Sequence, residues 1–169
     1  MQLFDISLPV RSGMVVYAGD SEVRLERSHT IAGGDSYNLS RLEFSVHTGT
    51  HIDAPLHFIE GAAGVERVPL GPLIGPAHVV DATAISADID VATLQRLAIP
   101  SGVRRLLFKT PNSQLWEREE FSPDFLGIRE DAARALVSSG VRLVGVDYLS
   151  VAPMADRRPR TACCWKRAS

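Results

Sequence analysis

The second half of the chain alternates apolar runs with helical segments, and this alternation constrains the fold more than any other feature of the sequence. Three apolar runs rich in β-branched residues are typical of buried strands: 77–83, 103–110 and 141–151. Between them, 88–99 and 129–140 have the pattern of helices, and Gly140 can end the second one. Strands that alternate with helices predict an α/β fold.

The first half is richer in β-strand signals. The segment 3–10 predicts a strand, 13–20 a short β-rich run between glycines, and 37–48 a half-buried strand in its alternating second half. A simple doubly wound sheet therefore does not describe the whole chain. At 169 residues, without repeats or low-complexity linkers, we expect one domain over 1–159.

Charge and hydropathy exclude several classes of protein. The formal net charge is −2 and the pI about 6.2, so we expect no nucleic-acid partner. No apolar run reaches the roughly 18 residues of a membrane span, and the N-terminus lacks a basic region followed by a long apolar stretch. We expect a cytoplasmic protein with no membrane partner.

The segment "HTGTHIDAPLHF", residues 47–58, holds three of the five histidines in the chain. His47 and His51 have the i, i+4 spacing that places two side chains on one helix face. A helix is nevertheless not expected, because Thr48, Gly49 and Thr50 are poor helix formers. A strand that runs into a tight loop fits better, and Gly49 allows the backbone to turn so that the two imidazoles converge.

Asp53 adds a carboxylate two residues after His51. Two imidazoles and one carboxylate suit Zn²⁺, and also Mn²⁺ or Fe²⁺, and three protein ligands leave an open position for water. His57 is either a fourth ligand or the base that takes a proton from water, since imidazole titrates near neutrality. Phe58 can supply an apolar wall.

Weaker signals lie outside this segment. Tyr17 precedes a glycine turn that is either a plain turn or part of a substrate wall. The polar residues of 108–116 either line a site or form a solvated loop, and the loop is favoured. Asp147 stands in an apolar run, where a buried carboxylate needs a partner. We interpret it as an anchor of a hydrogen-bond network rather than a site residue.

The segment 47–58 resembles the signature of the cyclase family of metal-dependent hydrolases, which includes bacterial kynurenine formamidase and isatin hydrolase. "FDISLPVRSGMVVYAGD", "LLFKTPNSQLW" and "LVGVDYLSVAP" are similar to other parts of that family. The resemblance implies a swivelling β/β/α fold with a mixed β-sheet core and flanking helices. It also implies a homodimer, one or two divalent metal ions, and hydrolysis of a small-molecule amide, often N-formyl or cyclic.

Carried over residue by residue, the resemblance makes His47, His51 and Asp53 metal ligands and His57 the catalytic histidine. It places Tyr17 near the substrate. One departure lies beside Tyr17: Ala18 stands where a proline commonly precedes the Gly-Asp of this turn.

A second departure is near the C-terminus. The family is expected to supply a further histidine and a glutamate as metal ligands, but this sequence has no histidine after His78 and no glutamate after Glu130. Reading the codons of Cys163 to Lys166 one base out of frame forces Leu-Leu-Glu, and the codons of Arg160 and Thr161 then allow histidine. Our hypothesis is that residues 160–169 are an aberrant tail produced by a frameshift.

These observations leave three hypotheses on function. The first is a metal-dependent amidohydrolase, most simply an arylformamidase that converts N-formyl-L-kynurenine to L-kynurenine and formate. Isatin-like lactams fit the same chemistry. The second is a catalytically inactive, truncated relative that binds a metal or a small molecule, and the third is a metal-free structural protein.

Overall fold

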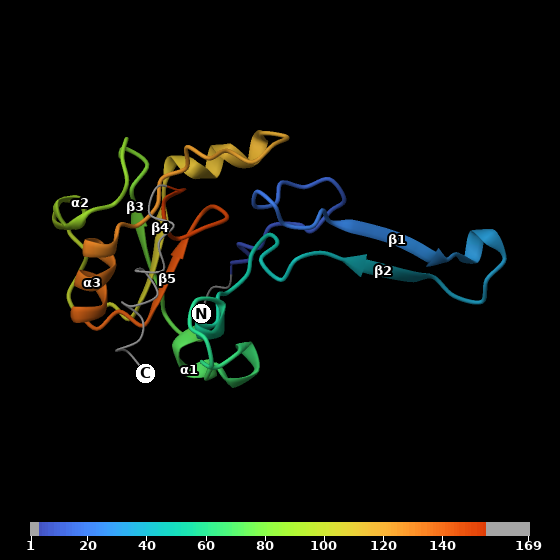
Figure 1. Ribbon diagram of the computed structural model, residues 1–169, viewed down its shortest axis with the longest axis horizontal. Helices are drawn as coiled ribbons and strands as arrows, with labels where there is room; N and C mark the ends of the chain where they lie inside the picture. Colours follow the sequence, from blue (N-terminus) through green and yellow to red (C-terminus); the bar gives the residue numbers. More distant parts are fainter. Residues whose placement is uncertain (1–3, 155–169) are drawn as a thin grey trace. The chain divides into compact units, whose positions relative to one another are not determined.

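The computed structural model describes residues 4–154, and these residues form two compact units (Figure 1). The first unit extends to Ile52 and also includes Arg118–Phe121. The second consists of Asp53–Glu117 and the chain from Ser122 onward. The predicted tail, 160–169, lies outside the described residues, and the single domain over 1–159 stays a prediction.

The first unit contains an antiparallel hairpin of β1 (Arg24–His29) and β2 (Leu39–Glu43). The 3₁₀ helix η1 (Ile31–Gly33) forms part of its connection. Arg24 pairs with Glu43 and Glu26 with Arg41, so one face of the hairpin carries opposite charges directly across the strands. Leu25 pairs with Leu42 on the other face. Arg27 and Ser40 pair on the same face as the two leucines, so the apolar part of that face is the leucine pair.

The strand predictions for the first half were partly wrong. No strand forms within 4–10 or 13–20. Within 37–48, a half-buried strand was expected in the second half, but β2 lies in the first half and is exposed. Gly13 has a φ of 70° in a turn, and Pro9 has no backbone donor, so neither favours a continuous ladder. Strand β1 was missed because alternating charged residues give it little apolar signal.

The second unit confirms the predicted α/β pattern. A parallel sheet has the order β3 (His78–Asp81), β4 (Arg105–Lys109), β5 (Leu143–Val146). Helices α2 (Val91–Arg96) and α3 (Glu130–Ser138) lie between these strands in the sequence. The remaining elements are short: η2 (Pro55–His57), η3 (Val65–Arg67), α1 (Leu70–Leu73) and η4 (Pro111–Glu117).

The core of this unit forms between the sheet and its helices (Figure 1). Leu106 and Phe108 of β4 are almost fully buried, with exposed fractions of 0% and 2%. Ala132 and Leu136 of α3 are buried in the same cluster, as their i, i+4 spacing requires. Gly140 has a φ of 89°, and the N–H of Val141 donates to the Leu136 carbonyl at 3.1 Å. This confirms the glycine end predicted for α3.

Asp147 follows β5 directly and acts as the predicted anchor. Its carboxylate accepts hydrogen bonds from the N–H and hydroxyl of Thr110, both at 2.7 Å, and from the Ser113 hydroxyl at 2.5 Å. Asn112 is buried, and its side-chain amide bonds both backbone groups of Leu126. Hydrogen bonds made by its polar residues therefore fix the segment after β4. The prediction of a solvated loop was wrong for Thr110 and Asn112, which are buried.

Within 4–154, no helix is both long and apolar enough to span a bilayer.

Candidate metal centre

The segment from His47 to Asp53 is a loop without helical structure, as the threonines and the glycine predict. Gly49 has a φ of 59°, in the left-handed region that residues with a Cβ rarely adopt. This turn reverses the backbone between His47 and His51. The predicted role of Gly49 in bringing the two imidazoles together agrees with this geometry.

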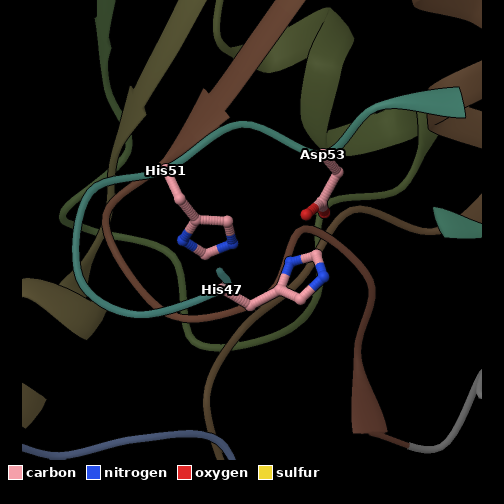
Figure 2. Close-up of side chains that lie close together, drawn as sticks. All are labelled: His47, His51 and Asp53. Carbon is pink, nitrogen blue, oxygen red and sulfur yellow. The ribbon is translucent and has the colours of Figure 1, made fainter. Parts of the chain in front are cut away.

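The three side chains expected to bind a metal lie together. One ligand atom from each of His47, His51 and Asp53 lies within 4.8 Å of the other two. The two imidazole rings are 5.2 Å apart between centroids and nearly perpendicular, at 83°. Figure 2 shows both rings and the carboxylate directed toward a common space. The two histidines are half-buried, whereas Asp53 is exposed.

A hydrogen bond selects the tautomer of His51. Its Nδ1 lies 2.9 Å from the Gly49 carbonyl oxygen. A carbonyl can only accept, so Nδ1 carries the proton and Nε2 is the ring nitrogen with the lone pair when the ring is neutral. Metal-binding histidines in proteins commonly donate their second ring N–H to a backbone carbonyl or a carboxylate in this way.

These donors fit a divalent metal ion. Nitrogen and oxygen ligands lie about 2.0–2.2 Å from Zn²⁺, so in a tetrahedral site they are roughly 3.3–3.6 Å apart. A separation of at most 4.8 Å is closed by small rotations of the side chains. The set of two imidazoles and one carboxylate can therefore hold a metal through nitrogen and oxygen atoms.

His57 is the last residue of η2. Its ring packs against the ring of Phe58, with 4.1 Å between the ring centroids. Among the described residues, His57 does not belong to the group of three ligand atoms. This favours the reading of His57 as a base over that of a fourth ligand. Phe58 is 55% exposed, so its ring is available to a bound molecule.

Tyr17 is half-buried and packs against Phe121, with 4.9 Å between ring centroids. Phe121 comes from the short segment Arg118–Phe121 that joins the first unit. Sequence reasoning did not find Phe121, because no local pattern relates it to a residue more than 100 positions earlier.

A parallel sheet with helices, an antiparallel hairpin and a His-His-Asp cluster define a mixed α/β protein with a candidate metal centre. The family model "Cyclase" matches residues 4–153. The chain is 35% identical to kynurenine formamidase of Erythrobacter litoralis (strain HTCC2594) over 156 residues, which covers 92% of this chain and 70% of that protein. The chain belongs to the cyclase family.

Other relatives agree with this assignment. Cyclase-like protein 2 of Oryza sativa subsp. japonica is 40% identical over 163 residues, covering 89% of this chain. The chain spans only 58% of the length of that rice relative.

Solved structures confirm the predicted fold class. One, described as a potential metal-dependent hydrolase with cyclase activity, matches 98% of this chain and 76% of its own, with a TM-score of 0.78 and 37% identity. Another, described as a predicted metal-dependent hydrolase from Bacillus stearothermophilus, matches 98% of this chain and 77% of its own, with a TM-score of 0.77 and 34% identity.

Proposed function

We propose that the chain is a metal-dependent amidohydrolase, and that its substrate is N-formyl-L-kynurenine. The observation that carries the proposal is the convergence of His47, His51 and Asp53 within 4.8 Å. Family membership and the similarity to several kynurenine formamidases, at about 35% identity, support the reaction and the substrate. N-formyl and cyclic amides share the bond that is broken, so lactams are the next substrates to test.

The proposed site would hold Zn²⁺, or alternatively Mn²⁺, through His47, His51 and Asp53, with one or two ions in total. A divalent ion bound there supplies a Lewis acid for the carbonyl oxygen and acidifies a bound water. The His51 Nδ1–H bond to Gly49 would leave Nε2 as the ring nitrogen that could bind the ion.

His57 is proposed as the general base. Its neutral imidazole takes a proton from the attacking water as oxygen bonds to the formyl carbon. The same imidazole then gives the proton to the amine nitrogen as the C–N bond breaks. Water is thus added across that bond, and the products are L-kynurenine and formate. Tyr17 and Phe58 are proposed to contact the aromatic part of the substrate.

We also propose a cytoplasmic homodimer. An exposed leucine pair on the hairpin supports a second copy as partner, because Leu25 and Leu42 lie across from each other and remain 46% and 55% exposed. A two-stranded hairpin is marginally stable alone. On the opposite face Arg24 and Glu26 lie across from Glu43 and Arg41, so the leucine pair is the part of the hairpin where burial against another chain would remove apolar surface from water.

A second candidate is a catalytically inactive relative that binds a metal or a small molecule. It is favoured by one observation, that among the described residues the group able to hold a metal has three members and does not include His57. A three-ligand site can still bind a metal while lacking the groups needed for turnover.

One experiment separates the two candidates. The purified chain is loaded with Zn²⁺, its metal content is measured, and formate release from N-formyl-L-kynurenine is followed. Stoichiometric metal and formate release that His57→Ala abolishes support the hydrolase. Stoichiometric metal without formate supports the inactive relative. A chain without metal, in which His47→Ala and His51→Ala change neither metal content nor Tm, supports a metal-free structural protein.

A further inference from the structure

A hydrogen bond fixes the metal loop to a distant part of the chain. The hydroxyl oxygen of Thr50 accepts from the backbone N–H of Leu8 at 2.9 Å, across 42 positions of sequence. Thr50 lies directly before His51 and directly after the left-handed Gly49. The bond therefore acts at the point where the backbone leaves its turn and enters the segment that carries two of the ligands.

The segment from Leu8 to Met14 also packs against the same turn. A methyl group placed on Gly49 would lie 3.5 Å from the Met14 Cε and 3.9 Å from a methyl carbon of Val10. Gly49 and Met14 are both buried. The turn is thus held from one side by apolar packing and by the hydrogen bond to Leu8.

Two hydrogen bonds of the loop are local. The Thr48 N–H donates to the Ser45 carbonyl at 3.0 Å, and the His51 ring donates to the Gly49 carbonyl at 2.9 Å. Such bonds shape the turn, but they do not fix it relative to the rest of the first unit. The Thr50–Leu8 bond does so, because it joins the loop to a segment far away in sequence.

We propose that Thr50 is a positioning residue for the metal centre, acting through the backbone of His51. The proposal rests on the proposed metal site. By accepting from Leu8, the hydroxyl holds the His51 backbone and the Gly49 carbonyl, which in turn orients the imidazole. Without it, binding a metal must also order the loop, and that ordering costs affinity. Groups that orient metal ligands commonly change affinity 10–100-fold when removed.

Thr48 provides a matched control two residues away. It is 5% exposed, and its hydroxyl oxygen is buried without a hydrogen-bond partner. Thr48→Val therefore removes a hydroxyl of the same type from the same loop without breaking a bond. Thr50→Val breaks the bond to Leu8, and Thr50→Ser keeps an oxygen that can accept it.

The test is a titration of Zn²⁺ alone into the metal-stripped chain and these three variants, by calorimetry, with the Tm of each metal-free protein as a second readout. We expect Thr50→Val to weaken Zn²⁺ binding about tenfold. We expect Thr50→Ser and Thr48→Val to stay within about twofold of the unsubstituted chain, on the same basis.

Three results would overturn the proposal. The first is a Thr50→Val variant that loses Tm without losing affinity, since Thr50 would then be merely structural. The second is equal weakening by Thr48→Val. The third is a failure of Thr50→Ser to restore binding. If the unsubstituted chain does not bind Zn²⁺, the metal site itself is wrong and the role of Thr50 falls with it.

Discussion

Gly49 shows how a single residue controls the candidate site. Its φ of 59° is costly for any residue with a Cβ, by about 1 kcal/mol or slightly more. Space is not the obstacle, because an added Cβ would make only ordinary contacts, the nearest at 3.5 Å. Backbone conformation, rather than packing, therefore makes glycine the suitable residue at this position.

The prediction that follows is for Gly49→Ala. We expect a lower Tm and roughly fivefold weaker Zn²⁺ binding, the equivalent of about 1 kcal/mol. Gly49→Asn is expected to lose less, because asparagine tolerates the left-handed region. Gly34→Ala is the control, since Gly34 has a φ of 99° at the end of η1 and an added Cβ there meets nothing within 4 Å. Unchanged Zn²⁺ affinity in Gly49→Ala, or an equal loss in Gly34→Ala, would contradict this role.

The ligand residues could be predicted from sequence because they fall within seven positions. A turn at Gly49 is sufficient to bring His47, His51 and Asp53 together, and residue type alone indicates both the turn and the ligands. The bond from Leu8 to Thr50 and the packing of Phe121 on Tyr17 were not predictable in this way. Each joins residues that are distant in sequence, so only the fold brings them into contact.

At the scale of elements, the same difference separates the two halves of the chain. Strands β3, β4 and β5 were predicted because buried parallel strands must be apolar on both faces. The hairpin strands are exposed along almost their whole length, so most of their residues are charged or polar and only Leu25, Leu39 and Leu42 are apolar. Their pairing depends on register and cross-strand partners, which composition does not indicate.

The exposed leucines of the hairpin lead to a prediction about the oligomeric state. If a second copy covers Leu25 and Leu42, a charge at Leu42 should separate the copies. We expect Leu42→Lys to convert a dimer to a monomer in size-exclusion chromatography with light scattering. Leu70→Lys adds the same charge at another exposed leucine, 66% exposed on α1, and should leave the dimer intact. A chain that is monomeric without substitution would contradict the dimer, and a dimeric Leu42→Lys would contradict the role of the hairpin.

The N-terminal cap of helix α2 leads to a prediction about how stability depends on pH. Asp90 caps its N-terminus and accepts from the Thr93 N–H at 2.7 Å, and this bond holds the pKa of the Asp90 carboxyl below its ordinary value. The hydrogen bonds to Thr93 are the main cause of the lowered pKa, and the positive charges of Arg96 and Arg129 contribute less. A depressed pKa stabilises the folded state above the ordinary pKa of aspartate, about 3.9, and that contribution is lost as the pH falls through the lowered value.

We therefore expect Asp90→Ala to lower the Tm at pH 7, and we expect this deficit to shrink as the pH falls below the ordinary aspartate pKa of about 3.9. Asp90→Asn should retain most of the Tm at pH 7, because asparagine is also a good N-cap. Thermal melts of the three proteins between pH 7 and pH 3 test both statements. An Asp90→Ala deficit that is constant across this range would show that the carboxylate charge is not involved.

At the scale of the whole molecule, metal binding and stability are linked. The ligands converge only when Gly49 is in its turn, so the unfolded chain offers no equivalent site. A metal that binds only the folded state adds about 2.7 kcal/mol of stability when its free concentration is 100 times Kd. For a chain of this size, that corresponds to a rise in Tm of roughly 5–10 °C.

We expect Zn²⁺ to raise the Tm of the chain by this amount, and EDTA to reverse the rise. His47→Ala and His51→Ala should abolish the shift, because each removes a nitrogen donor from the three-atom group. His78→Ala is the matched control, since His78 lies on β3, outside that group, and should retain the full shift.

A shift that persists in both His47→Ala and His51→Ala would place the bound metal elsewhere. A shift lost equally in His78→Ala would indicate general destabilisation rather than the loss of a ligand. Because the measurement needs no substrate, it tests the metal centre whether or not the chain turns over N-formyl-L-kynurenine.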